Sequence, residues 1–349
     1  MKKKSIISLI KYHAEKNDVG FRDEAYEIAR EFDRVGDSQL SGYIMTLLSN
    51  ANTFVPQMTE PEFEYLERVE STNELLLLSD TITEEIHGMI NAIQRQLGSN
   101  KFLFEGAPGT GKTEAVKHLG RILNRVVYMV DFSLIIDSKL GQTQKNITKL
   151  FKEINQISQP DKFIILFDEI DALAMDRTDS NDLREMARST TTLFKGLDAL
   201  NEDIVLIATT NLYAHFDKAL IRRFDSVINF NHYTEEDLLK ISESMLDHYL
   251  SKTKLVKRDI RLFRKIIKLF SHIPYPGDLK NIIKTAISFS SLTDDTDYFR
   301  KLYCKVCDEK PKDIHKLQDQ GFTVREIEIL TGMSKSSVAR SLKEVGCSE

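Results

Sequence analysis

Gly106-Ala107-Pro108-Gly109-Thr110-Gly111-Lys112-Thr113 is the stretch around which the chain is organised. It fits the pattern G-x-x-x-x-G-K-[ST]. Its glycines allow tight turns that aim successive backbone N–H groups at one anion, and the following helix adds its positive N-terminal end. Lys112 can reach the outer phosphates of a nucleotide, and the Thr113 hydroxyl can ligate Mg²⁺. The loop therefore predicts a phosphate site made of Gly106, Pro108, Gly109, Thr110, Gly111, Lys112 and Thr113.

Strand and helix patterns alternate on both sides of this loop, from residue 100 to about 230. The apolar runs that we expect to be strands are 101–105, 126–130, 163–167, 204–208 and 227–230. Helical patterns lie between them, at 114–124, 142–157 and 181–200. Apolar strands separated by helices imply a parallel sheet covered on both faces. The fold class is therefore α/β.

Acidic and amide side chains follow two of the predicted strands. Asp168 and Glu169 come directly after 163–167, and Asn211 follows 204–208. In a phosphate site Asp168 helps to hold Mg²⁺, Glu169 accepts a proton from the attacking water or orients it, and Asn211 positions that water. Arg222 and Arg223 follow further along the chain. They are either an ordinary surface pair or arginine fingers that neutralise charge on the transferring phosphoryl group of a neighbouring subunit.

These motifs, in this order, resemble the AAA+ ATPases and the AAA subgroup in particular, over roughly residues 75 to 290. Gly106–Thr113 matches the Walker A motif, Asp168-Glu169 is close to the subgroup's Walker B sequence, and Asn211 falls at sensor 1. The segment Gly277-Asp278-Leu279-Lys280 is similar to the start of the lid helix, which places Lys280 near sensor 2. The resemblance implies a P-loop NTPase core with a helical lid, ATP and Mg²⁺ as ligands, and a homo-oligomer, normally a six-membered ring.

Two segments depart from the subgroup. The usual finger segment R-P-G-R-F-D is here Arg222-Arg223-Phe224-Asp225, so either arginine can be the finger. Lys139 stands where members that thread peptides carry an aromatic residue before Gly141. That lysine weakens the prediction of a loop that grips peptides, and it suits an acidic polymer or a phosphate backbone about as well.

The flanking segments complete a predicted division into five parts. Residues 1–50 read as a small helical module, 51–74 as a linker, 75–232 as the α/β core, 233–308 as the lid and 309–349 as a tail. The helical layout up to Leu48, with Phe21-Arg22, resembles bacterial AAA ATPases that are paired with a subtilisin-like protease in phage defence or plasmid exclusion. We therefore expect residues 1–50 to bind a protein partner, which the resemblance suggests is a protease.

The tail resembles a helix-turn-helix. Helices are expected to end at Gly321-Phe322, to span Val324–Thr331 and to run from Lys335 to Val345, with Gly332 in the turn. Ile327, Leu330, Val338 and Leu342 would form a small core, which leaves Lys335, Ser336, Ser337, Arg340 and Lys343 outside. Because Glu326, Glu328 and Glu344 offset part of this charge, two interpretations stay open: DNA binding through 311–345, or a module that docks a protein.

Composition limits the remaining choices. The chain has 349 residues and a formal net charge of -5, so any DNA contact must be local. We expect a cytoplasmic protein with no membrane span and no disulfide framework, and Cys304-x-x-Cys307 lacks the ligands of a zinc site. The favoured function is a ring-forming ATPase that remodels a protein or nucleoprotein. The alternatives are a DNA-associated regulator of the transposition or replication type, and a nucleotide-dependent switch or scaffold with little turnover.

Overall fold

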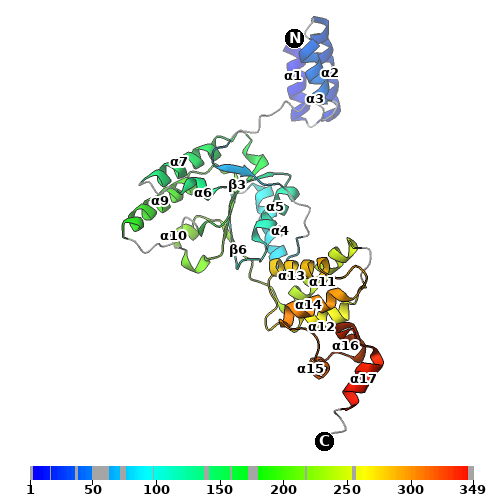
Figure 1. Cartoon of the computed structure of the whole chain (residues 1–349). Coiled ribbons are helices and arrows are strands. Elements are labelled where there is room, and N and C mark those ends of the chain that lie inside the picture. The colour runs from blue at the N-terminus through cyan, green and yellow to red at the C-terminus, as the bar shows by residue number, and fades with distance from the viewer. Residues whose placement is uncertain are drawn as a thin grey trace. The chain divides into compact units, whose positions relative to one another are not determined.

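The computed structural model describes residues 3–15, 17–35, 38–48, 63–70, 76–96, 98–136, 141–157, 159–171, 180–216, 218–253 and 257–344. The chain divides into two compact units, Met1–Glu62 and Phe63–Glu349. In Figure 1 the first unit is the blue helical bundle, and the second contains the sheet and all later helices.

The first unit consists of α1 (Lys3–Ala14), α2 (Asp18–Val35) and α3 (Ser38–Leu48), as the apolar spacing predicts. Ala25, Ile28 and Ala29 bury one face of α2. The apolar face expected on the first helix is largely open, because Ile6 is 42% exposed and Ile10 is 65% exposed. The module therefore keeps part of its apolar surface outside its own core.

A six-stranded sheet forms the centre of the second unit. Its strands are β1 (Leu66–Arg68), β2 (Lys101–Glu105), β3 (Val126–Val130), β4 (Phe163–Phe167), β5 (Val205–Thr210) and β6 (Ser226–Asn229). The strand order is β1-β3-β4-β5-β2-β6, and all pairs are parallel except β1 with β3. Strand β1 was not predicted, because it lies inside the segment 51–74 that was expected to be a linker.

Helices cover both faces of the sheet, which is why its strands are apolar throughout. On β2, Phe102 and Phe104 pack against α4 (Asp80–Arg95) and α5 (Lys112–Ile122), while Leu103 points into the opposite cluster. That opposite cluster is formed with α6 (Phe132–Ile135), α7 (Gln142–Asn155), α9 (Ser180–Asp198) and α10 (Lys218–Ile221). Two short 3₁₀ turns, η1 (Pro160–Lys162) and η2 (Tyr213–His215), complete the core. The predicted α/β class is confirmed.

The lid consists of α11 (Glu235–Ser251), α12 (Ile260–Ile267), α13 (Pro276–Ser288) and α14 (Asp297–Cys307). Thr234 and Asp237 form a capping box at the start of α11. Cys304 and Cys307 lie on α14 as free, half-buried thiols. Among the described residues, no helix combines the length and apolarity needed to cross a membrane.

The tail consists of α15 (Ile314–Asp319), α16 (Val324–Thr331) and α17 (Lys335–Glu344). Gly332 ends α16 with a φ of 75°, a conformation that favours glycine. Ile327, Leu330 and Val338 are buried as expected, and Leu342 is partly buried. Their core is continuous with that of the lid, so the tail packs as an extension of the lid rather than as a separate small unit. Figure 1 shows α16 beside the lid helices.

Candidate active site

The glycine-rich loop joins β2 to α5, as predicted, and residues after β6 form hydrogen bonds to its backbone. Gly109 and Gly111 have φ values of 78° and 97°, in the left-handed region that a side chain would strain. The Tyr233 hydroxyl donates to the Thr110 carbonyl at 2.9 Å, and the Ala107 N–H donates to Asn231 Oδ1 at 2.8 Å. The segment after β6 therefore holds the loop open, a role that the sequence did not reveal.

Lys112 is the buried cation of the site, with 7% of its surface exposed. Its Nζ donates to the carbonyls of Gly106 and Ala107 at 2.7 and 3.0 Å, and to Asn211 Oδ1 at 2.8 Å. Burial lowers the pKa of this ammonium, although Asp168, Asp171 and Glu169 act in the opposite direction. Because neutral oxygens surround the charge, a phosphate oxygen at this place gains a strong electrostatic partner.

Thr113 and Asp168 meet at the end of β4. The Thr113 hydroxyl donates to the Asp168 carboxylate at 2.9 Å. The Thr209 hydroxyl on β5 donates to Asp168 Oδ1 at 2.6 Å and accepts the Glu169 N–H at 2.9 Å. A hydroxyl and a carboxylate side by side are hard oxygen donors of the kind that Mg²⁺ binds, so the residues present fit that ion. Thr209 was missed, although its place at the end of the strand next to β4 pointed to it.

Glu169 follows Asp168 in an unusual backbone conformation. Its φ is 51°, in the left-handed region that is sparsely populated for a residue with a side chain. The carboxylate is exposed to solvent, and its Oε1 lies 3.4 Å from Asn211 Nδ2. Asn211 thus connects Lys112 on one side to Glu169 on the other. The structure brings together the residues that were predicted from two separate strands.

Asp171 is a further buried carboxylate that sequence reasoning did not assign. It is 7% exposed, accepts the Thr210 hydroxyl, and accepts the Asn211 N–H at Oδ2 over 2.9 Å. It therefore ties the turn after β4 to the end of β5 and sets the position of Asn211. The only sequence signal was its place two residues after Glu169.

We expect Asp171→Asn to lower the rate of ATP turnover by about 10- to 100-fold, because one of its two donors loses its acceptor and Asn211 shifts. ATP affinity should change little, since Lys112 and the loop glycines stay in place. Turnover and nucleotide titration of the variant measure both. The control is Asp308→Asn, an exposed position with a φ of 54° that asparagine also tolerates. Equal rates for D171N and the unaltered chain would contradict a positioning role.

The start of α13 closes the site from the lid side. The Gly277 N–H donates to the Gly109 carbonyl at 2.8 Å. A Cβ on Gly277 would lie 2.9 Å from Gly109 Cα, so this approach depends on glycine at 277. The phosphate loop, the ends of β4 and β5 and the start of α13 enclose a cavity of about 290 Å³. Its lining includes Lys112, Asp168, Asn211 and Lys280. Lys280, expected near sensor 2, therefore faces the same cavity as the phosphate loop.

Gly277→Ala should push α13 away from the loop and raise the KM for ATP several-fold, because the added methyl meets Gly109 backbone atoms that cannot easily move. Steady-state kinetics measures this. Gly42→Ala serves as the control, because a Cβ at Gly42 meets nothing within 4 Å. An unchanged KM in G277A would show that the lid does not have to approach the loop this closely for ATP to bind.

Arg222 and Arg223 lie in different surroundings. Arg223 Nε is 3.0 Å from Asp198 Oδ1, and its guanidinium stacks 4.2 Å from the centre of the Phe194 ring. The side chain of Arg222 is exposed, and it has no hydrogen bond or ion pair within the described part of the chain. Neither arginine lines the cavity of its own chain. The local contacts of Arg223 thus make Arg222 the better candidate for reaching another subunit.

Lys139 lies outside the described residues, together with the rest of the segment before Gly141. The expectation for this segment therefore stays a prediction.

A family model described as "ATPase family associated with various cellular activities (AAA)" matches residues 102–232. An uncharacterised AAA family ATPase of Sinorhizobium fredii is 30% identical over 61% of this chain and 70% of its own length. A 26S proteasome regulatory subunit homolog of Methanocaldococcus jannaschii is 31% identical over 57% of this chain and 52% of its own.

More distant matches point the same way. The vesicle-fusing ATPase of Dictyostelium discoideum is 29% identical over 66% of this chain and 32% of its own length. A chain from the E. coli MS115-1 HORMA:CdnC:Trip13 complex superposes with a TM-score of 0.56 at 15% identity, over 71% of this chain and 95% of its own. That likeness concerns the fold alone. The chain spans about half of the archaeal relative and a third of the vesicle-fusing one.

Proposed function

The chain belongs to the AAA family of ATPases, and we propose that it couples ATP hydrolysis to the remodelling of a protein or nucleoprotein partner as a ring of identical subunits, six in number. The observation that carries this proposal is one connected network. Asn211 links Lys112 to Glu169, and Asp168 links Thr113 to the end of β5, all on the wall of one cavity.

Phosphate binding is the first task of this network. Lys112 and the N–H groups of Gly109, Thr110 and Gly111 would hold the phosphates at the start of α5, where the helix dipole favours an anion. Gly106 and Pro108 shape the loop, and Lys280 adds a cation from the lid. Thr113 and Asp168 would hold Mg²⁺, which supplies neutralisation of the phosphate charge.

Activation of water is the second task. Glu169 has a solvent-exposed carboxylate next to the Asn211 amide, so it can accept a proton while the amide orients the water that loses it. This pairing argues against a switch that binds ATP and hardly turns it over. No described feature of the cavity therefore favours the alternative of a nucleotide-dependent scaffold with little turnover.

Charge neutralisation in the transition state is the third task, and we assign it to Arg222 of an adjacent subunit. Arg222 is exposed and does not line the cavity of its own chain, which supports this assignment. Hydrolysis would then depend on assembly, because an isolated subunit lacks that charge.

A protein partner is the substrate that we favour. Relatives named as a proteasome regulatory subunit homolog and a vesicle-fusing ATPase support this class. In the N-terminal unit, Ile7 and Tyr43 are 66% and 45% exposed in addition to the open Ile6 and Ile10, so the unit offers exposed apolar side chains to such a partner. Pairing with a protease in bacterial phage defence is the narrower form of this proposal and rests on the layout of the N-terminal helices.

The direct test is phosphate release by the full chain with ATP, in Mg²⁺ and after chelation, together with sedimentation of the same samples. We expect Mg²⁺-dependent turnover in a species of about six subunits. ATP turnover that persists after chelation, or that belongs to a sedimenting monomer, would overturn the assignment of the site or of the ring.

A further inference from the structure

The outer face of α17 carries basic and hydroxyl side chains with few partners. Lys335, Ser336, Ser337, Arg340 and Lys343 are all exposed, while Val338 on the opposite face is buried. Within residues 257–344, which the structure describes without a gap, no ion pair involves Lys335, Arg340 or Lys343. Their charge is therefore available to an anionic partner.

Two acidic residues of α16 have partners within the fold. Glu326 is 7% exposed, and its Oε2 lies 2.6 Å from Lys265 Nζ on α12. Hydrogen bonds to Lys265 and Thr323 hold the pKa of this carboxyl below its ordinary value against the effect of burial. Glu328 accepts the backbone N–H of Lys335 at 3.2 Å, so it supports the start of α17. Glu326 therefore offsets the charge of Lys265 on α12 and not the exposed charges of α17.

The turn before α17 presents this face in a fixed orientation. Gly332 ends α16 in the left-handed conformation, and Ser334 Oγ accepts the Ser337 N–H at 3.3 Å as α17 begins. Val338 anchors α17 in the core shared with Ile327 and Leu330. Two helices joined by a tight turn, with the second exposed along one basic face, form the arrangement that enters a DNA major groove.

We propose that α17 is a binding surface for duplex DNA, with Arg340 and Lys343 on phosphates or guanine edges and Ser336 and Ser337 on the backbone. Arginine, lysine and serine are the side chains that make most such contacts. This surface shares no residue with the ATPase site, so DNA binding can be tested separately from the proposed remodelling function.

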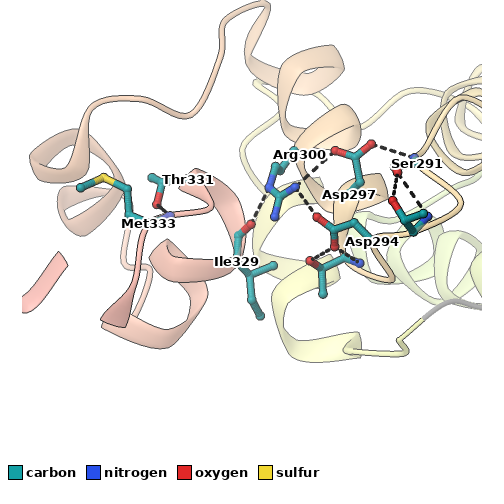
Figure 2. A network of polar contacts seen from close by, with 9 residues as sticks. Ser291, Asp294, Asp297, Arg300, Ile329, Thr331 and Met333 are labelled. Carbon is teal, nitrogen blue, oxygen red and sulfur yellow. Dashed lines mark hydrogen bonds and ion pairs between the residues drawn. The ribbon is translucent and has the colours of Figure 1, made fainter. Parts of the chain in front are cut away.

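The tail is also hydrogen-bonded to the lid, and this contact can couple DNA binding to nucleotide binding. Figure 2 shows Arg300 of α14 between the carboxylates of Asp294 and Asp297 and the Ile329 carbonyl at the end of α16. Its Nε donates to that carbonyl at 2.8 Å, and its Nη1 lies 2.6 Å from Asp294 Oδ2. Hydrogen bonds from Thr296 and Arg300 lower the pKa of Asp294 to about 2, so the ion pair between Arg300 and Asp294 stays charged at neutral pH.

The lid helices that hold the tail also contact the phosphate loop. Helix α14 packs on α13 in one hydrophobic cluster, and α13 begins at the Gly277–Gly109 contact. A change in the lid caused by ATP therefore moves α17 with it. DNA affinity and ATP affinity should be linked, and by thermodynamic reciprocity each ligand changes the other's affinity by the same factor.

The test is fluorescence anisotropy of the full chain with a labelled 30-base-pair duplex of mixed sequence at about 50 mM salt. Arg340→Glu with Lys343→Glu should weaken binding at least tenfold and reduce the salt slope by about two. The matched control, Lys301→Glu with Lys305→Glu, makes the same charge change on the exposed face of α14 and should alter the affinity less than twofold. Turnover without DNA should be unchanged in both variants.

Two results would overturn the proposal. One is the absence of duplex binding at low salt, which would leave the face to a protein partner. The other is an equal loss in both double variants, which would indicate general electrostatics rather than α17. Coupling is measured by repeating the titration with ADP and with ATPγS, and an identical affinity in both would refute the link between tail and lid.

Discussion

Glu169→Gln should lower ATP turnover by at least about a hundredfold and leave the affinity for ATP within about twofold. Glutamine keeps the size of the side chain and its place near Asn211, but it cannot accept a proton from water. The phosphate contacts belong to Lys112 and the loop, so binding does not depend on the substitution. Phosphate release and nucleotide titration measure the two effects separately.

The control for this variant is Glu84→Gln, which changes the same charge at an exposed position on α4. Turnover of E84Q should match that of the unaltered chain. Undiminished hydrolysis in E169Q would exclude Glu169 as the residue that activates water. A loss of binding in E169Q would instead indicate that the substitution disturbs the loop.

Arg222→Ala should lower turnover by about a thousandfold, on the order of the effect of a missing arginine finger, without lowering the affinity for ATP. Arg223→Ala acts differently, because it removes the ion pair to Asp198 and the stacking on Phe194 and so reduces thermal stability. Turnover, nucleotide titration and thermal melting of both variants distinguish these roles. A reversed pattern, with R223A inactive and stable, would assign the finger to Arg223.

Mixing two inactive variants tests whether the arginine acts across an interface. In a mixed ring, an E169Q subunit can donate Arg222 to the intact Glu169 of an R222A subunit. With equal amounts and random assembly, roughly a quarter of the sites contain both residues, so activity returns to that level if sites act independently. A mixture as inactive as its components would place Arg222 in its own subunit's site or outside the reaction.

The elements with strong local signals were predictable from sequence. Lys112 and Thr113 end a glycine pattern that is specific to phosphate-binding loops. The run 163–167 is apolar because both faces of β4 are covered. Asp168, Glu169 and Asn211 were found because the carboxyl ends of parallel strands meet at one edge of a sheet. The structure places these side chains together, and their chemical roles remain proposals.

The remaining features depend on contacts between distant segments. Strand β1 has only three residues, and its pairing with β3 leaves no periodic pattern to read. Asp171 and Thr209 resemble ordinary turn and strand residues until β4 and β5 are adjacent. Glu326 counted against a basic tail in the sequence, whereas its partner Lys265 lies 61 positions away and turns it inward. Such pairings follow from the packed fold and not from local propensity.

The measurement that tests the central claim most directly is ATP turnover per subunit as a function of protein concentration, followed in parallel by sedimentation. A site completed by a neighbour's Arg222 predicts that the rate per subunit rises with concentration and levels off when assembly is complete. A rate per subunit that stays constant down to concentrations where only monomers sediment would contradict the shared site and the ring built on it.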